Sequence, residues 1–220
     1  MNIRDIIPSI VLDTLRDRYL AGVADAEAVF EMHRADEDAV TGALGQSIAT
    51  RDPIFFTTER GQFAAKISYR KIRGRGPGAP ERVYGADGIF QIEVINSSGD
   101  IVRSKGLPFQ SKTNWRGKKK DLFEQATKMQ GHFGGGIVID FTESGYRACT
   151  AQAAISARGS RPAVERERSM HALGQMLSRD FLDCTIGTTG LFFDPANEAF
   201  ALQALGQGAH LISTEIVEVR

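Results

Sequence analysis

The chain has 220 residues, of which 42% are apolar and 25% are charged, and its formal net charge is zero. This composition is that of a globular protein with one generous core, or with a core domain and a small appendage. It excludes a membrane-spanning helix, because no apolar run approaches the roughly 18 residues that such a helix needs. The first residues also lack the order of charged, apolar and small segments found in signal peptides.

The two cysteines, Cys149 and Cys184, form neither a metal-binding spacing nor a disulfide framework. A reducing, cytoplasmic location is therefore the simplest expectation. The four histidines do not form the two-histidine spacing of a zinc site, so surface or capping roles are expected for them.

Positive charge is concentrated in the middle of the chain. Residues 60–120 hold 14 Lys and Arg against 4 Asp and Glu, whereas residues 1–50 hold 9 acids against 4 bases. One interpretation is a mosaic surface on which the charges cancel. The other is an electropositive face for a phosphate backbone, which we favour because the excess surrounds the candidate site described below.

Two helices are expected first. Apolar residues recur at helical spacing over residues 9–33, with a break expected near Ala21-Gly22. A second helix is expected to begin after Asp36, which is a good N-cap, and to stop before Asp52-Pro53. Acids at a helix start are favoured by the helix dipole, and this is the simplest explanation of Glu37 and Asp38.

Two strands, Ile54–Thr58 and residues 61–69, are expected next, and a basic segment rich in Gly and Pro follows them. Its glycines resemble a phosphate-binding loop only superficially. Pro77 and Pro80 remove amide donors, and the segment leads into a strand rather than a helix. We therefore predict a loop whose Arg73 and Arg75 contact a nucleic-acid backbone.

A β-hairpin is expected from the stretch around Asn96-Ser97-Ser98-Gly99-Asp100, with strands over residues 89–95 and 101–112. If Ser98-Gly99 are the central residues of a two-residue turn, Asp87 lies directly opposite Gln110. Lys112 shares the sheet face of Gln110, because side chains alternate along a strand. The hairpin therefore brings a carboxylate, an amide oxygen and an ammonium group together.

These groups suit a metal-dependent phosphodiesterase. Mg²⁺ prefers hard oxygen ligands, which Asp87, the side-chain carbonyl of Gln110 and the main-chain carbonyl of Ser111 can supply. Lys112 is placed to stabilise hydroxide and the charge that develops on a phosphate. A second acid is needed, and Glu37 is the first candidate, with Asp38 as the alternative.

A basic cluster follows the hairpin and precedes a helix of about ten residues. Cations at a helix N-terminus oppose the helix dipole, so nucleic-acid binding is one explanation and a solvated turn is the other. The cluster comprises Arg116, Lys118, Lys119 and Lys120.

The remaining chain alternates strand and helix patterns. A buried strand is expected over residues 137–141, a further strand over 146–155, and a helix over 163–182. Strands over residues 189–193 and 210–219 are expected to flank a short helix over 197–205.

The order of these motifs resembles the PD-(D/E)XK nuclease superfamily, and more narrowly its Mrr-like branch, in which Gln replaces the usual acid of the E-x-K element. The matching pieces are Glu37 in DEDAVTGALGQ, Asp87 in YGADG, Gln110 and Lys112 in FQSK, and a following helix that bears Gln125. The likeness covers roughly residues 30–155. It implies an α/β fold with a restriction-endonuclease-like core, in which helices flank a central mixed sheet.

The resemblance also implies Mg²⁺-dependent cleavage of DNA, with Mn²⁺ able to substitute. We expect residues 1–160 to form the nuclease core, and residues 161–220 to complete it or to form an interface. A small nuclease of this kind suggests a role in restriction or anti-phage defence, with a partner protein or as a homo-oligomer and without a membrane partner. The alternatives are an inactive module of the same fold that binds nucleic acid or protein, and a structural subunit.

Overall fold

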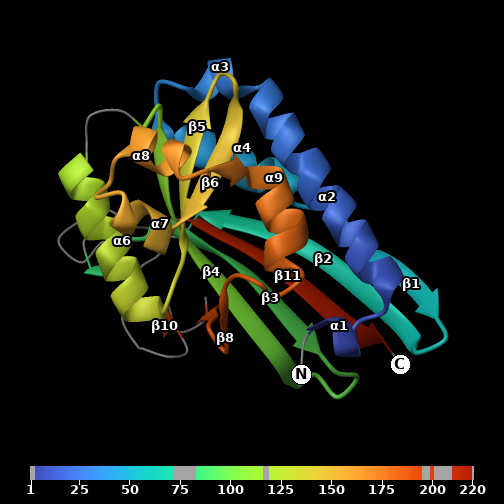
Figure 1. The fold of residues 1–220 in the computed structure, drawn as a ribbon. Helices are drawn as coiled ribbons and strands as arrows, with labels where there is room; N and C mark the ends of the chain where they lie inside the picture. Colours follow the sequence, from blue (N-terminus) through green and yellow to red (C-terminus); the bar gives the residue numbers. More distant parts are fainter. Residues whose placement is uncertain (1–2, 72–82, 116–118, 195–198, 201–209, 220) are drawn as a thin grey trace.

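The computed structural model describes residues 3–71, 83–115, 119–194, 199–200 and 210–219. It is an α/β protein built on a nine-stranded mixed open sheet with helices packed against it (Figure 1). The expectation of a central mixed sheet flanked by helices is therefore confirmed.

The sheet has the order β1-β2-β11-β3-β4-β5-β6-β7, and β8 pairs with β4. The C-terminal strand β11 is parallel to β3 and antiparallel to β2. It therefore joins the β1–β2 pair to the β3–β4 pair. The strands are β1 (Ile54–Thr58), β2 (Gly61–Lys71), β3 (Gly88–Ile95), β4 (Ile101–Thr113), β5 (Ile137–Thr142), β6 (Gly145–Thr150), β7 (His171–Ala172), β8 (Thr188–Thr189) and β11 (His210–Val219), with β9 (Phe193–Asp194) and β10 (Ala199–Phe200) forming a separate pair.

Helices cover both faces of the sheet (Figure 1). On one face lie α1 (Ile3–Ile6), α2 (Ser9–Ala28), α3 (Phe30–His33), α4 (Glu37–Ile48), α9 (Leu173–Gln175) and the π-helix η1 (Met176–Phe181). On the other lie α6 (Lys119–Phe133), α7 (Ala151–Ser156) and α8 (Arg161–Arg166).

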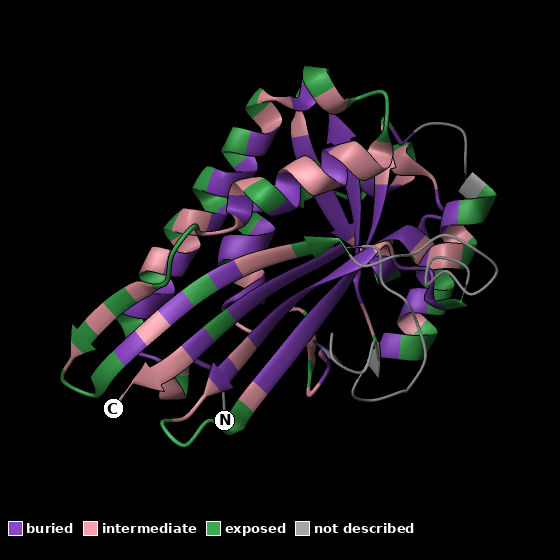
Figure 2. Cartoon of the chain, turned by 180° about the vertical axis from the view of Figure 1, so that it is seen from behind, coloured by how far each residue is buried: buried purple, intermediate pink, exposed green. Residues whose placement is uncertain are grey.

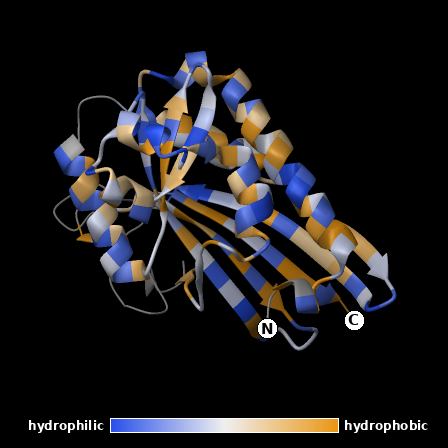
Figure 3. Cartoon of the chain, in the orientation of Figure 1, coloured by the Kyte–Doolittle hydropathy of each residue, from blue (hydrophilic) through white to orange (hydrophobic). Residues whose placement is uncertain are grey.

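Alternation along the strands divides the core into two clusters. On β3, Phe90 and Ile92 pack with the α2 and α4 side, whereas Ile89 packs with the α6 side. All of β5 is buried, as expected for a strand covered on both faces, and Figure 2 shows the inner strands almost entirely buried. Polar and apolar residues alternate along α2 and α6 in Figure 3, as expected for helices with one solvated side.

The sheet forks where β3 begins. Gly88, the first residue of β3, pairs with Phe109 of β4 and with His210 of β11. From Phe109 to Thr113, β4 pairs in parallel with β5. The last residues of β4 therefore extend past Gly88, the first residue of β3. The loop that precedes β3 faces these residues of β4.

The hairpin has the predicted register but a different turn. Gly88 faces Phe109 and Val94 faces Arg103, as a two-residue turn would require. The turn is longer, because the Asn96 backbone N donates to the Asp100 carbonyl at 3.0 Å. A register shift between Val94 and Ile95 compensates for the additional turn residue.

Gly22 does not break the first long helix, contrary to our expectation. Helix α2 continues through it and ends at Ala28, with the interruption at Val29. A Cβ atom at Gly22 would lie 2.6 Å from the Ile48 Cα atom of α4. Glycine is therefore needed for the close approach of α2 and α4.

We expect Gly22→Ala to lower the free energy of unfolding by about 2 kcal/mol or more, because the obstructing atoms belong to the backbone of α4. Gly131→Ala in α6 is the matched control, since a Cβ there meets nothing within 4 Å. That substitution should raise stability by about 0.5–1 kcal/mol through helix propensity. Urea unfolding measures both changes, and equal effects at the two positions would contradict this explanation of Gly22.

Four expectations for the C-terminal third are wrong. The strand expected over residues 146–155 ends at Thr150, whose Oγ1 accepts from the Ala153 N and caps α7. The helix expected over residues 163–182 is divided into α8, β7, α9 and η1, because Arg168 adopts a left-handed φ of 55°. Ala199–Phe200 form strand β10 rather than helix, and the rest of residues 197–205 lies outside the described residues.

The strand expected over residues 189–193 is divided between β8 and β9, with Gly190 at a φ of 80° between them. Across the residues that the structure describes, no helix combines the length and the apolar character needed to cross a membrane.

Candidate active site

The four residues expected to be catalytic meet at the fork of the sheet. Glu37 is the first residue of α4, and Asp87 directly precedes β3. Gln110 and Lys112 lie on the part of β4 that extends beyond β3. The hairpin and the N-terminus of α4 thus place them together, although they come from three separate parts of the chain.

The Asp87 carboxylate is held by β4. Its Oδ2 accepts from the Gln110 Nε2 at 2.6 Å, from the Ser111 N at 2.7 Å and from the Ser111 Oγ at 2.7 Å. The Thr41 Oγ1 of α4 lies 3.3 Å from the Ser111 Oγ, so a buried polar chain links α4 to Asp87. Ser111 contacts Asp87 through its N–H and hydroxyl, while its main-chain oxygen lies 3.3 Å from the Gln110 Nε2.

The loop that carries Asp87 is also fixed against α6. Gly85 has a φ of 73°, and a Cβ there would lie 2.1 Å from the Gln125 carbonyl oxygen. His210 closes the other side, because its backbone N donates to the Asp87 carbonyl at 3.1 Å. Gln125, the helix residue of the resemblance, therefore lies against this loop.

Glu37 contacts the other end of the site. Its Oε1 lies 3.5 Å from the Lys112 Nζ, and its Oε2 accepts from the Thr113 N at 2.9 Å. The Lys112 side chain is 13% exposed and that of Glu37 is 37% exposed. Lys112 is therefore largely enclosed, and its ammonium group has a carboxylate partner at the protein surface.

Asp38, the alternative acid, points to a different partner set. Its carboxylate pairs with Lys71. It also accepts a hydrogen bond from the His210 Nε2 at 2.8 Å. Burial alone would raise the pKa of Asp38, but the hydrogen bonds from Lys71 and His210 outweigh it and lower that pKa. Asp38 thus stays ionised beside the site, and Glu37 is the acid that reaches β4.

His210 connects Asp38 to Tyr69. Burial lowers the pKa of His210, although Asp38 partly opposes the change. A carboxylate beside Nε2 favours a proton on that nitrogen, which leaves Nδ1 to accept from the Tyr69 hydroxyl at 2.9 Å. Burial raises the pKa of Tyr69 to about 12, so it remains a donor. This buried histidine has a fixed role, not the surface or capping role that we expected.

One buried atom at the site is suited to a cation. The Gln110 side chain is fully buried, its Nε2 faces Asp87, and its Oε1 has no hydrogen-bond partner in the described part of the chain. An amide carbonyl without a donor is costly unless something binds it, and a hard cation does so. Asp87 and Gln110 therefore fit a Mg²⁺ site, although the described residues contain no cluster of three His, Cys, Asp or Glu placed to hold a metal.

A buried acid lies next to Lys112. Asp140 is opposite Lys112 in the pairing of β4 with β5 and is fully buried. Its Oδ1 accepts from the Trp115 N at 2.7 Å, and its Oδ2 lies 2.5 Å from the Arg161 Nε. Burial raises the pKa of Asp140, and the contacts with Trp115 and Arg161 only partly offset this.

The raised pKa gives Asp140 a defined effect on stability. Its protonated form favours folding, so its contribution is complete below the ordinary pKa of 3.8 and is lost as the pH rises through the higher folded value. We expect the stability of Asp140→Asn, relative to wild type, to increase as the pH rises above about 4. Urea unfolding at several pH values tests this, with the exposed Asp25→Asn as control. A relative stability that does not change with pH would contradict it.

The residues predicted to bind nucleic acid are described only in part. Arg73, Arg75, Arg116 and Lys118 lie outside the described residues. Lys119 begins α6, and Lys120 follows it. Lys120 is 88% exposed and its Nζ lies 4.0 Å from the Glu124 Oε1, so it belongs to the surface of the helix.

Comparison with protein-family models, curated proteins and solved structures finds no match for this chain. The fold and the contacts described above are therefore the basis for any functional assignment.

Sequence reasoning missed several residues of this region. Asp140 gave a usable signal, since an acid within the apolar run IVIDF requires a buried partner. The partners themselves, Arg161 and Trp115, are distant in sequence and gave none. Thr41 and Tyr69 were equally inconspicuous, because single polar residues within a helix or a strand are common.

Proposed function

We propose that this chain is a metal-dependent nuclease with a restriction-endonuclease-like core that hydrolyses phosphodiester bonds in DNA. The observation that carries the proposal is the convergence of Glu37, Asp87, Gln110 and Lys112 at the fork of the sheet. The order of these residues in the sequence is that of the PD-(D/E)XK superfamily, with the Q-x-K form of its Mrr-like branch.

Each side chain has a defined task in this proposal. Asp87 and the Gln110 Oε1 would hold Mg²⁺, which when bound supplies a positive charge that lowers the pKa of water and stabilises the phosphate. Ser111 keeps the Asp87 carboxylate in place through two hydrogen bonds. The Lys112 ammonium orients the attacking water and stabilises negative charge on the phosphate, and Glu37 holds the ammonium in position.

Cleavage of supercoiled plasmid with Mg²⁺ or Mn²⁺, and with EDTA in their place, tests the proposal. Asp87→Asn is the informative variant, because the amide oxygen can still accept from the two Ser111 donors while the negative charge is lost. We expect metal-dependent nicking by wild type and by the exposed-surface variant Asp25→Asn, and none by Asp87→Asn. Nicking by wild type that persists in EDTA would overturn the metal-dependent assignment.

The second candidate is an inactive module that binds nucleic acid or a partner protein. It is favoured by the Asp87 Oδ2, which already accepts three hydrogen bonds, and by the single carboxylate that Q-x-K leaves beside Gln110. Salt-sensitive DNA retention without turnover in either metal would support this module over the nuclease.

As part of the same proposal, we assign the nuclease to restriction or anti-phage defence, acting with a partner protein or as a homo-oligomer. The support for this is the resemblance alone. Cleavage that requires a co-expressed partner would be consistent with it.

A further inference from the structure

A polar pocket adjoins the candidate active site at the carboxyl ends of β4 and β5. Its volume is about 490 Å³, and it is lined by Asn114, Thr142, Glu143, Ser144 and Arg161. Asn114 directly follows β4, and Thr142 is the last residue of β5. These two strands are parallel, and the carboxyl ends of parallel strands are the usual ligand position in open α/β sheets.

The pocket lies close along β4 to the residues proposed to cut DNA, because its lining residue Asn114 directly follows that strand. Asn114 is two residues beyond Lys112, and the intervening Thr113 N donates to Glu37. The Asn114 N donates to the Phe141 carbonyl at 2.9 Å, which fixes the pocket rim to β5. Two residues span at most roughly 7 Å of chain, so the Asn114 side of the pocket is about one nucleotide repeat from Lys112.

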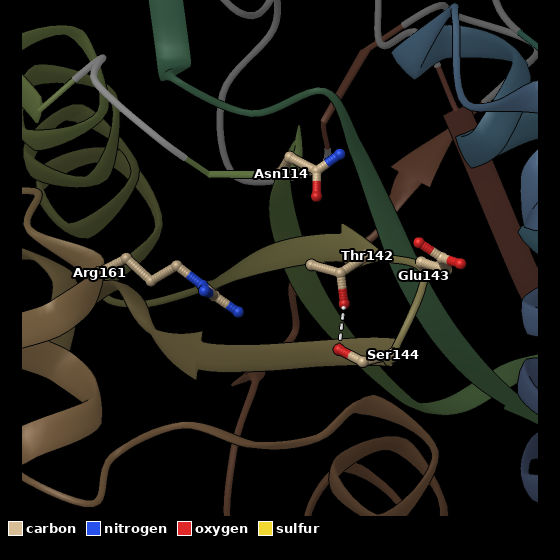
Figure 4. Close-up of a pocket in the computed structure, with 5 residues that line it drawn as sticks. All are labelled: Asn114, Thr142, Glu143, Ser144 and Arg161. Carbon is tan, nitrogen blue, oxygen red and sulfur yellow. Dashed lines mark hydrogen bonds between the residues drawn. The ribbon is translucent and has the colours of Figure 1, made fainter.

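The lining favours a neutral ligand with several hydrogen-bonding groups. Figure 4 shows the Arg161 guanidinium extending toward Thr142 and Ser144, with Asn114 facing the same space. Arg161 already pairs with Asp140 and lies 3.5 Å from the Glu165 Oε1, and Glu143 adds a further acid. The lining thus holds one acid and one cation, and that cation is already paired with Asp140, which disfavours a phosphate group.

The side chains match the edges of nucleobases. Asparagine pairs with adenine, arginine with guanine, and a carboxylate accepts from the amino group of cytosine. The Ser144 hydroxyl lies 3.0 Å from the Thr142 Oγ1, which itself lies 2.8 Å from the Gly145 carbonyl, so both hydroxyls have fixed positions.

We infer that this pocket receives one nucleobase of the DNA strand that is cut, beside the scissile phosphate. The inference rests on the proposed nuclease function and extends it to a substrate class. A base within a stacked duplex does not enter a concave pocket, so the nucleotide must be unpaired or flipped. The substrate is therefore single-stranded or locally unpaired DNA.

Binding of mononucleotides in EDTA tests the pocket without any cleavage. The four deoxynucleoside monophosphates and deoxyribose 5-phosphate, which lacks the base, are titrated into the isotopically labelled full chain. We expect at least one nucleotide to shift the NMR signals of the Asn114 amide and the Arg161 Nε–H, and deoxyribose 5-phosphate to leave them unmoved. Equal shifts with deoxyribose 5-phosphate, or no pocket shift with any nucleotide, would overturn the inference.

Asn114→Gly is the matching variant, because Asn114 has a φ of 50° that glycine adopts without strain. It should weaken nucleotide binding by about fivefold or more, the loss expected for one good hydrogen bond. Arg168→Gly is the control, since Arg168 is an exposed residue with a φ of 55° and lies outside the pocket lining. An equal loss in both variants would overturn the role of Asn114.

The two proposals fail separately. If nucleotides shift the NMR signals of the pocket residues in a protein that never cleaves plasmid, the base pocket is kept and the nuclease proposal is removed. Metal-dependent cleavage by a protein whose Asn114 and Arg161 NMR signals do not shift would keep the nuclease and remove the base pocket. For an active protein, we also expect a duplex with an unpaired bubble to be cut at least about tenfold faster than a fully paired duplex, since no base need then be extruded.

Discussion

Lys112→Ala should reduce metal-dependent DNA cleavage by about 10²–10⁴-fold, the range observed when a positioned catalytic group is removed. The ammonium group lies in a largely enclosed position, 3.5 Å from the Glu37 Oε1. Water that replaces it cannot supply a fixed positive charge. The initial rate of plasmid nicking at saturating Mg²⁺ measures the effect.

The same substitution should change stability little. The Lys112–Glu37 pair is partly exposed, so its loss is expected to cost less than about 1 kcal/mol. Lys66→Ala is the matched control, because Lys66 is an exposed lysine on β2 at a distance from the fork. If Lys112→Ala nicks plasmid as fast as Lys66→Ala, the role assigned to Lys112 is wrong.

Local sequence signals were sufficient for the parts of the site that neighbouring residues determine. Asp36 accepts from the Asp38 N as an N-cap, so the start of α4 and the position of Glu37 followed from capping alone. The hairpin placed Asp87 beside Gln110, because its register depends on the turn and the strand alternation. The turn itself was predicted incorrectly, and the register was correct only because the register shift in β3 offsets the longer turn.

Such local signals do not predict which strands pair when they are distant in the sequence. The run from His210 to Val219 reads as a strand, but nothing in it predicts a place between β2 and β3 or a His210 bond to the Asp87 carbonyl. The fork has the same origin, since it depends on where β3 begins relative to β5. These features result from burial across the whole sheet, which overrides local preference.

The segment over residues 163–182 shows how a periodic pattern can mislead. Leu173, Leu177 and Phe181 are fully buried, so the apolar spacing correctly identified a core-facing segment. The chain before them makes a separate short helix and then a short strand beside β6. Periodicity identifies the face that is buried, but it does not establish a continuous helix.

Gln110→Glu should make stability depend on metal. The new carboxylate would lie where the Gln110 Nε2 now donates to the Asp87 Oδ2 at 2.6 Å, in a fully buried position. Two carboxylates at that distance repel each other, and one of them takes up a proton. In EDTA at neutral pH we expect the free energy of unfolding to fall by about 1.4 kcal/mol for each unit by which burial and repulsion raise the pKa of the carboxyl that takes up the proton.

Mg²⁺ should restore much of that loss, because a cation bound between the two carboxylates stabilises only the folded state. Thermal unfolding with EDTA and with Mg²⁺ measures the recovery. Gln91→Glu is the matched control, since Gln91 is a buried glutamine on β3 whose Nε2 lies 3.4 Å from the Glu93 Oε2, away from the fork. It should lose stability without recovering it in Mg²⁺. Equal responses of the two variants would remove Asp87 and Gln110 as metal ligands, because only a site built around that pair distinguishes one buried glutamine from the other.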